Sequence, residues 1–167
     1  MLYNLKVLYE MKRILFVCLG NICRSPLAEG VFKSYIESNG LSNRILCDSA
    51  GTAGYHIGSK PDKRSLKIAN DYGITLDHYG KKLFFKDFED FDYIIAMDQN
   101  NFLDILTLKG EVNVKAKLLL FRDFDPNGTG DVPDPYHGTM ADFEDVYKIC
   151  ERTSKKLVDY ILNDSLT

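Results

Sequence analysis

Four short runs of apolar residues recur along the chain and predict the strands of a sheet. Each run is continuous and does not alternate with polar positions, which is typical of parallel strands covered on both faces. The predicted strands are Arg13–Val17, Arg44–Asp48, Asp92–Met97 and Lys117–Phe121.

Segments with helical periodicity separate and follow these runs. The last helix is the clearest, because its apolar residues fall on one stripe and Thr139 with Asp142 offers a capping-box start. At the first helix, Ser25 suits the capping position and Pro26 the first helical position. The earlier helices are predicted over Pro26–Ser38, Pro61–Tyr72 before Gly73, and Asp98–Leu108 before Gly110, and the last stripe comprises Phe143, Val146, Tyr147, Cys150, Leu157, Val158 and Ile161.

The alternation of strands and helices predicts an α/β fold. Right-handed crossovers then give a doubly wound, four-stranded parallel sheet with helices on both faces. In such sheets a ligand binds at the carboxyl ends of the strands, near a topological switch point. Cys18 stands at the end of the first strand, so we expect a functional site there.

Length and composition assign most of the chain to one domain. The 167 residues are 45% apolar, and a domain of about 150 residues buries roughly two-thirds of its unfolded surface without disulfides or metals. We assign residues 11–167 to a single domain. Residues 1–10 precede a second methionine, Met11, and we interpret them as a flexible N-terminal extension.

Charge and hydropathy restrict the partners and the location. A net charge of -3 and a pI near 5.6 argue against nucleic-acid binding. The apolar core Ile14 to Leu19 is too short for a secretory signal, and no run approaches the roughly 20 apolar residues of a membrane-spanning helix. We therefore expect a cytoplasmic protein that binds no membrane and whose four cysteines stay reduced.

The stretch "CLGNICRSP", residues 18–26, has the composition of an oxyanion-binding loop. Its backbone N–H groups and the following helix N-terminus can surround a phosphoryl group, which the planar fork of Arg24 can grip. Gly20 adds no side-chain bulk, and Asn21 tolerates left-handed backbone geometry. The same surroundings favour the thiolate of Cys18, to which Ser25 can donate. The alternative is a core turn whose cysteines are small apolar fillers.

The stretch "VCLGNICRSPLAE", Val17 to Glu29, resembles the signature of the low-molecular-weight protein tyrosine phosphatases. The resemblance continues through "CDSAGT", "FDYIIAMD" and "DPYHG". It implies a four-stranded parallel sheet flanked by helices, with Cys18 as nucleophile and Arg24 as phosphate ligand. The phosphate-binding loop would comprise Leu19, Gly20, Asn21, Ile22, Cys23 and Ser25.

A phosphate ester also needs an acid to protonate its leaving oxygen. The segment 121–138 contains several aspartates, of which only Asp134 lies between two prolines that stiffen the backbone; the others are Asp123, Asp125 and Asp131. The resemblance selects Asp134, because "DPY" matches the general-acid motif of the family. The implied cycle passes through a cysteinyl-phosphate on Cys18 and requires no metal or other cofactor.

Other positions bear on substrate and regulation. Tyr55 and Tyr136 are candidate walls for a phenyl ring, with Leu19 and Ile22 at the rim. Related protein arginine phosphatases resemble this loop with threonine at the position of Ile22, so isoleucine favours phosphotyrosine. We expect phosphotyrosine-containing proteins as substrates, and phosphate and other oxyanions as ligands; the alternatives are an arginine phosphatase and a non-catalytic phosphopeptide-binding module.

The resemblance assigns supporting roles to three further residues. Ser49 and His78 match positions that brace the loop through hydrogen bonds with Asn21 and Ser25. Cys23 would form a reversible disulfide with Cys18 under peroxide and so protect the nucleophile. Read alone, Ser49 and His78 are ordinary loop residues and Cys23 is a core filler.

Overall fold

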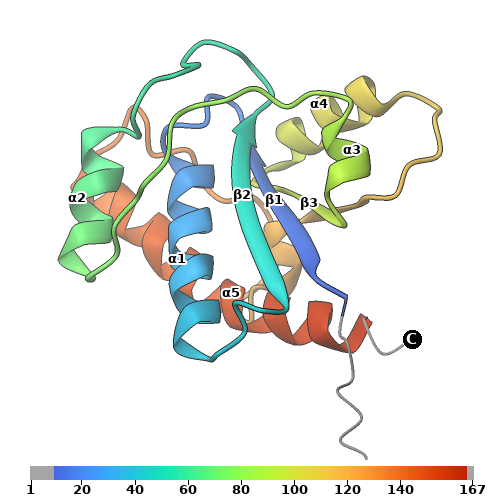
Figure 1. Cartoon of the computed structure of the whole chain (residues 1–167). Helices are drawn as coiled ribbons and strands as arrows, with labels where there is room; N and C mark the ends of the chain where they lie inside the picture. Colours follow the sequence, from blue (N-terminus) through green and yellow to red (C-terminus); the bar gives the residue numbers. More distant parts are fainter. Residues whose placement is uncertain (1–9, 165–167) are drawn as a thin grey trace, which may run out of the picture.

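A computed structural model of the chain describes residues 10–164, so the predicted extension lies outside the described residues except for Glu10. Its four parallel strands are β1 Lys12–Cys18, β2 Ile45–Gly51, β3 Tyr93–Ala96 and β4 Lys117–Leu120, in the order β2-β1-β3-β4 (Figure 1). The predicted sheet is confirmed. The chain leaves β1 toward β2 on one side and later crosses to β3 on the other, which makes the carboxyl end of β1 the switch point.

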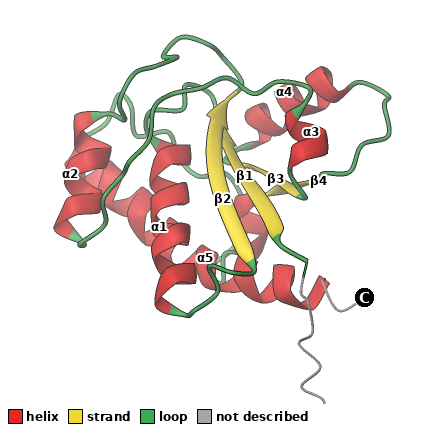
Figure 2. Cartoon of the chain, in the orientation of Figure 1, coloured by secondary structure: helices red, strands yellow, loops and turns green. Residues whose placement is uncertain are grey.

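Helices cover both faces of this sheet (Figure 2). One face carries α1 Arg24–Ser38 and α5 Met140–Asp164, with α2 Lys63–Asp71 packed beside them; the other carries α3 Asp87–Asp90 and α4 Gln99–Lys109. Within residues 10–164, no helix has the length and apolar character needed to cross a membrane.

Alternate side chains of β1 enter two separate cores. Ile14 and Phe16 pack among the residues of α1 and α5, and Phe16 makes an edge-to-face contact with Phe32 of α1, with 5.2 Å between ring centroids. Leu15 and Val17 point to the other face and join the core beneath α3 and α4. All four are fully buried, as the continuous apolar run predicts. Burial on both faces fixes the position of β1, and therefore the position of Cys18 at its carboxyl end.

Several predicted boundaries shift for local reasons. α1 begins at Arg24 and not at Pro26, because the loop itself winds into the first turn. Pro26 then occupies the third helical position, where its missing N–H costs no hydrogen bond. The prediction that Ser25 caps the helix is therefore wrong: its hydroxyl lies beside the Cys18 sulfur. The fourth strand ends at Leu120, since Phe121–Phe124 form a 3₁₀ turn.

Candidate active site

The turn between β1 and α1 brings Cys18 to the carboxyl end of the central strand. Within this turn Asn21 has a φ of 55°, the left-handed geometry that asparagine tolerates better than most residues. Its backbone N–H donates to the Cys18 sulfur at 3.3 Å. The hydroxyl of Ser25 lies 3.0 Å from the same sulfur. The Cys18 sulfur therefore lies between a backbone donor and a hydroxyl group.

A buried network holds Asn21 from behind. Its amide nitrogen donates to the hydroxyl oxygens of Ser25 at 2.9 Å and of Ser49 at 3.0 Å. Its amide oxygen lies 2.8 Å from Nε2 of His78 and accepts the backbone N–H of Lys81 at 2.9 Å. The side-chain amide therefore uses both donors and both lone pairs, which fixes its orientation. The structure thus brings Ser49 and His78 into contact with the loop.

Arg24 lies under the loop with its guanidinium between two carboxylates. Nη1 donates to Oδ2 of Asp98 at 2.5 Å and to the carbonyl of Val132 at 3.1 Å, and Nη2 donates to Oδ2 of Asp134 at 3.3 Å. The Arg24 side chain is only 4% exposed. Burial alone would lower the pKa of Arg24, but the negative charges of Cys18, Asp98 and Asp134 hold it above its usual value. Arg24 is therefore a permanent cation beside Cys18.

Asp134 is presented by a segment that is anchored on either side of it. The backbone N–H of Val132 donates to the carbonyl of Met97, next to the end of β3, at 2.8 Å. Val132 and Pro135 are buried, whereas the Asp134 side chain between them is 48% exposed. The backbone N–H of Tyr136 donates to Oδ1 of Asp134 at 3.2 Å. The carboxyl group is thus held toward Arg24 while it stays accessible to a ligand.

Arg64, near the start of α2, connects this segment to the loop between β1 and α1. Its guanidinium donates to the backbone carbonyls of Tyr136 at 2.9 Å and Gly138 at 3.2 Å. The same group pairs with Asp62 at 2.9 Å, and the backbone N–H of Asp62 donates to the carbonyl of Ile22 at 2.8 Å. The start of α2 therefore fixes the distance between the loop after β1 and the segment that carries Asp134.

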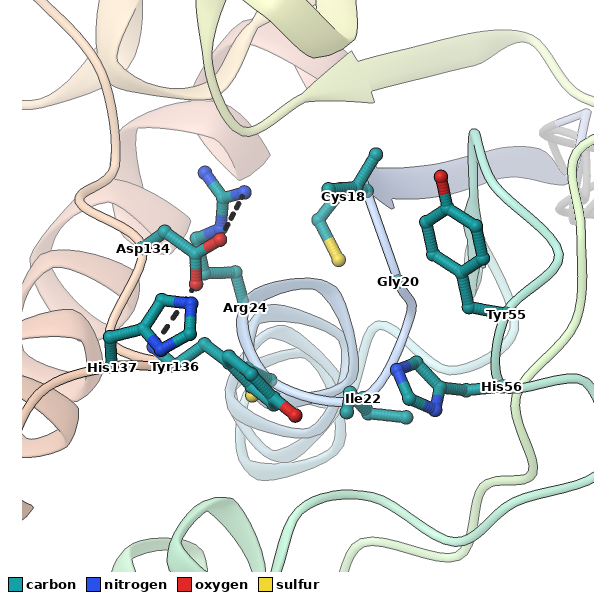
Figure 3. A pocket seen from close by; sticks show the side chains of 11 residues that line it. Cys18, Gly20, Ile22, Arg24, Tyr55, His56, Asp134, Tyr136 and His137 are labelled. Atoms are coloured by element: carbon teal, nitrogen blue, oxygen red, sulfur yellow. Dashed lines mark hydrogen bonds and ion pairs between the residues drawn. The ribbon is translucent and has the colours of Figure 1, made fainter.

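These groups open into a pocket of about 270 Å³. Figure 3 shows the Cys18 sulfur facing the cavity, with Arg24 and Asp134 on one side and Tyr55 on the other. Tyr136 lies on the side of Asp134, so the two tyrosines stand across the pocket from each other (Figure 3). The remaining lining residues are Leu19, Gly20, Ile22, Cys23, His56 and His137.

Comparison with known proteins agrees with this arrangement. Residues 13–166 match the family model described as "Low molecular weight phosphotyrosine protein phosphatase". The chain belongs to this family. The Gallus gallus enzyme of that name is 41% identical over 151 residues, which cover 90% of this chain and 96% of the relative.

Solved structures share the fold of this family member. The protein tyrosine phosphatase of Entamoeba histolytica, crystallised with Hepes in its active site, has a TM-score of 0.87 and 39% identity, and covers 92% of this chain and 98% of its own. The Drosophila arginine phosphatase has a TM-score of 0.84 and 29% identity, and covers 90% and 98%. Proteins named for two kinds of phosphoresidue therefore share this architecture.

Several polar partners in this phosphatase-family site escape sequence reasoning. Asp98, Glu29 and Lys81 each bond a predicted site residue: Asp98 contacts Arg24, Glu29 accepts the Ser49 hydroxyl at 2.6 Å, and Lys81 contacts Asn21. His56 lines the pocket beside Tyr55. Of these residues, only Asp98 could have been suspected from the sequence, because it directly follows the third apolar run and starts a predicted helix.

The other aspartates of the acid segment lie away from the pocket. Asp125 is buried, and its carboxylate accepts from Arg122 at 3.0 Å and from Arg152 at 2.7 and 2.8 Å. Burial alone would raise the pKa of Asp125, but hydrogen bonds from Arg152, the Asn127 backbone and Arg122 lower it overall. Asp131 accepts from the Gln99 backbone. These contacts anchor the segment that carries Asp134.

The four cysteines occupy different environments. Burial raises the pKa of Cys23 to about 12, and the negative charges of Asp62, Cys18 and Asp134 add to the effect. Burial likewise raises the pKa values of Cys47 and Cys150, neither of which lines the pocket. Cys23 is therefore a protonated thiol beside the proposed nucleophile.

Three potential metal ligands, Glu29, Asp48 and His78, bring their ligand atoms within 4.8 Å of one another. Each already contacts a protein partner: Ser49 donates to Glu29, the ammonium of Lys81 pairs with Asp48, and His78 contacts Asn21. This cluster is accounted for as the outer part of the network behind the loop.

Proposed function

We propose that this chain hydrolyses phosphotyrosine in proteins, with Cys18 as nucleophile, Arg24 as phosphate ligand and Asp134 as general acid. The observation that carries the proposal is that these three side chains open into one pocket. The pocket combines a sulfur that accepts a backbone hydrogen bond and contacts a hydroxyl group, a buried cation and an accessible carboxyl group.

In the first step, the Cys18 thiolate attacks phosphorus, and the bond to the phenolic oxygen breaks. Arg24 and backbone N–H groups of the loop between β1 and α1 stabilise the charge on the phosphoryl oxygens. Asp134 donates its proton to the leaving oxygen, which departs as a neutral phenol. The products of this step are a cysteinyl-phosphate and the dephosphorylated tyrosine.

In the second step, Asp134 acts as a base toward water. The water oxygen bonds to phosphorus, its proton passes to Asp134, and the Cys18 sulfur leaves as a thiolate. Ser25 and the Asn21 backbone stabilise this leaving thiolate, since both contact the sulfur in the resting site. Inorganic phosphate is released, and all groups return to their starting protonation states.

The tyrosines across the pocket support a flat aromatic substrate. Tyr55 is 77% and Tyr136 44% exposed, so both rings present faces to a ligand, and a phenyl ring between them would gain stacking and burial. Ile22 at the rim adds an apolar surface. A competing phosphoarginine activity is the nearer alternative, because a structural relative is named for it.

A kinetic comparison tests the proposal. Wild-type protein should hydrolyse p-nitrophenyl phosphate and a phosphotyrosine peptide, Cys18→Ser should lose turnover, and the matched variant Cys47→Ser should keep it. In Asp134→Asn, turnover of phenyl phosphate should fall about 10²- to 10⁴-fold, and that of p-nitrophenyl phosphate less, because its leaving group needs less protonation.

Three outcomes would contradict the proposal. Activity of Cys18→Ser equal to that of wild type would remove the nucleophile assignment. Preference for phosphoarginine peptides would assign the arginine class. Peptide binding without phosphate release would indicate a binding module.

We also propose that Cys23 forms a disulfide with Cys18 after oxidation, which two buried thiols lining one pocket support. A thiolate nucleophile of this kind works under reducing conditions, so we propose the cytoplasm as its location. Peptide mapping after mild peroxide should find the Cys18–Cys23 pair, and a stable sulfinic acid on Cys18 would refute it.

A further inference from the structure

A second cavity, of about 400 Å³, lies beside the catalytic pocket and shares two of its walls. Leu19 and Tyr55 line both cavities. The second cavity continues over residues that the proposed reaction does not use, among them Lys82, Leu83 and Leu108. We refer to this second cavity as the flanking groove.

The flanking groove is held at a fixed position relative to Cys18. The backbone N–H of Thr52 donates to the carbonyl of Cys18 at 2.9 Å, and that of Ala53 donates to the carbonyl of Leu19 at 3.0 Å. Leu83, which also lines the groove, is fixed to the neighbouring end of β2, because its N–H donates to the carbonyl of Gly51 at 2.8 Å. The groove is therefore formed before a ligand arrives, which lowers the entropic cost of binding.

The neighbouring residues Lys81 and Lys82 differ in their contacts. The ammonium of Lys81 pairs with Asp48 behind the loop. Lys82 is exposed, lines the groove, and takes part in none of the ion pairs found among residues 10–164. The carboxylate in the groove, Asp104, accepts from the hydroxyl of Thr52 at 3.2 Å. The groove thus offers one cation that is free to meet an anionic ligand.

Apolar surface accompanies this charge. Leu19 and Leu108 are each 42% exposed, and Leu83 beneath them is 2% exposed. An aliphatic side chain laid on the two leucines would remove apolar area from water on both partners. The combination suits a peptide segment that carries an acidic residue next to an aliphatic one.

We propose that the flanking groove binds the part of a phosphoprotein substrate adjacent to its phosphotyrosine, with an acidic residue at Lys82 and an aliphatic residue on Leu19 and Leu108. This inference rests on the proposed function, since the phosphotyrosine must occupy the neighbouring pocket. An extended peptide advances about 3.3 to 3.6 Å per residue. Because Leu19 and Tyr55 line both cavities, the contact involves residues close in sequence to the phosphotyrosine.

The test compares substrates that fill one cavity with substrates that fill both. p-Nitrophenyl phosphate occupies only the catalytic pocket, whereas phosphotyrosine peptides with Glu and Leu at neighbouring positions reach the groove. Peptides with alanine at those positions are the reference. Lys82→Glu should raise KM for the acidic peptide about five-fold, as expected for an exposed charge pair. Added salt should shrink the difference.

Two further variants complete the design. Leu108→Ser should raise KM for the leucine-containing peptide, and both Lys82→Glu and Leu108→Ser should leave kcat for p-nitrophenyl phosphate unchanged. Lys155→Glu, the same charge change at an exposed position of α5, should leave all substrates unaffected. Moving the acidic residue along the peptide should identify one position at which Lys82→Glu has its effect.

The outcomes separate this inference from the proposed function. Failure of wild-type protein to hydrolyse p-nitrophenyl phosphate would refute the function itself. Normal hydrolysis together with equal KM changes for acidic and alanine peptides would refute the groove alone. Equal effects of Lys82→Glu and Lys155→Glu would assign the preference to net charge and would also overturn the groove assignment.

Discussion

Replacement of Asp98 by asparagine tests how the buried arginine is held. One carboxylate oxygen of Asp98 accepts from Arg24 at 2.5 Å, and the other caps α4 by accepting the Asn101 backbone N–H at 2.7 Å. Asparagine keeps a capping oxygen, since it caps helices about as well as aspartate. Its amide group, however, removes the negative charge opposite the guanidinium. Asp98→Asn therefore isolates the ion pair from the cap.

The expected cost follows from burial. The side chains of Arg24 and Asp98 are 4% and 15% exposed, and removing one partner of a buried pair costs about 3–5 kcal/mol. Arg24 keeps the Val132 carbonyl and Asp134 as partners, so we expect about 2–3 kcal/mol in the free energy of unfolding. Without Asp98 to fix its rotamer, the fork of Arg24 is misaligned. kcat/KM for an aryl phosphate should then fall about 10- to 100-fold.

Urea unfolding at neutral pH and steady-state kinetics measure the two quantities. Asp145→Asn, at an exposed position of α5, is the matched control and should behave as wild type in both assays. Wild-type stability and kcat/KM in Asp98→Asn would refute the reasoning, because the pair would then contribute neither to folding nor to orientation. A loss of stability without a loss of kcat/KM would refute the orientation argument alone.

Three further predictions concern the end of β2, the Cys23 thiol and the segment that carries Asp134. In Gly51→Ala the new Cβ would lie 2.7 and 3.0 Å from two backbone carbonyl oxygens. The free energy of unfolding should therefore fall by about 1–3 kcal/mol, and activity should fall as well. In Gly54→Ala the new Cβ would lie 3.3 Å from the end of the Ile57 side chain and 3.5 Å from that of Lys82, so this variant should be nearly neutral. Because the pKa of Cys23 is raised to about 12, the rate at which oxidised Cys18 is converted to the disulfide should rise about tenfold per pH unit between pH 7 and 9; a pH-independent rate measured by quenched mass spectrometry would contradict this. The lowered pKa of Asp125 contributes stability that is present above its unfolded value near 3.9 and lost as pH falls through the folded value. Asp125→Asn should therefore flatten the acid limb of the unfolding free energy against pH, and an unchanged limb would refute that assignment.

The local parts of the site are predictable from the sequence. Strand β1 reads as doubly covered because its five apolar positions are contiguous, and the loop after it is recognisable from Cys18, Arg24 and the glycine and asparagine between them. The helix stops at Gly73 and Gly110 are also confirmed, since both glycines have positive φ. Each of these features depends on residues close together in the chain.

Other features depend on tertiary contacts and escape such reasoning. Asp98 lies 74 residues from Arg24, and no periodicity marks the two as partners. Ser25 carries a good capping signal, yet its hydroxyl serves the sulfur of Cys18, because the loop extends the helix by two residues. The short helix α3 was not predicted, since four residues are too few to show a period.

The order β2-β1-β3-β4 also has a consequence for how the chain acquires activity. β1 joins both a strand that follows one helix later and a strand that lies beyond two further helical segments. Arg24 and Asp134, which meet in the pocket, are 110 residues apart. Contacts of such long sequence separation form slowly, because loop closure must precede them. We therefore expect turnover to recover after dilution from denaturant only when the whole sheet is complete.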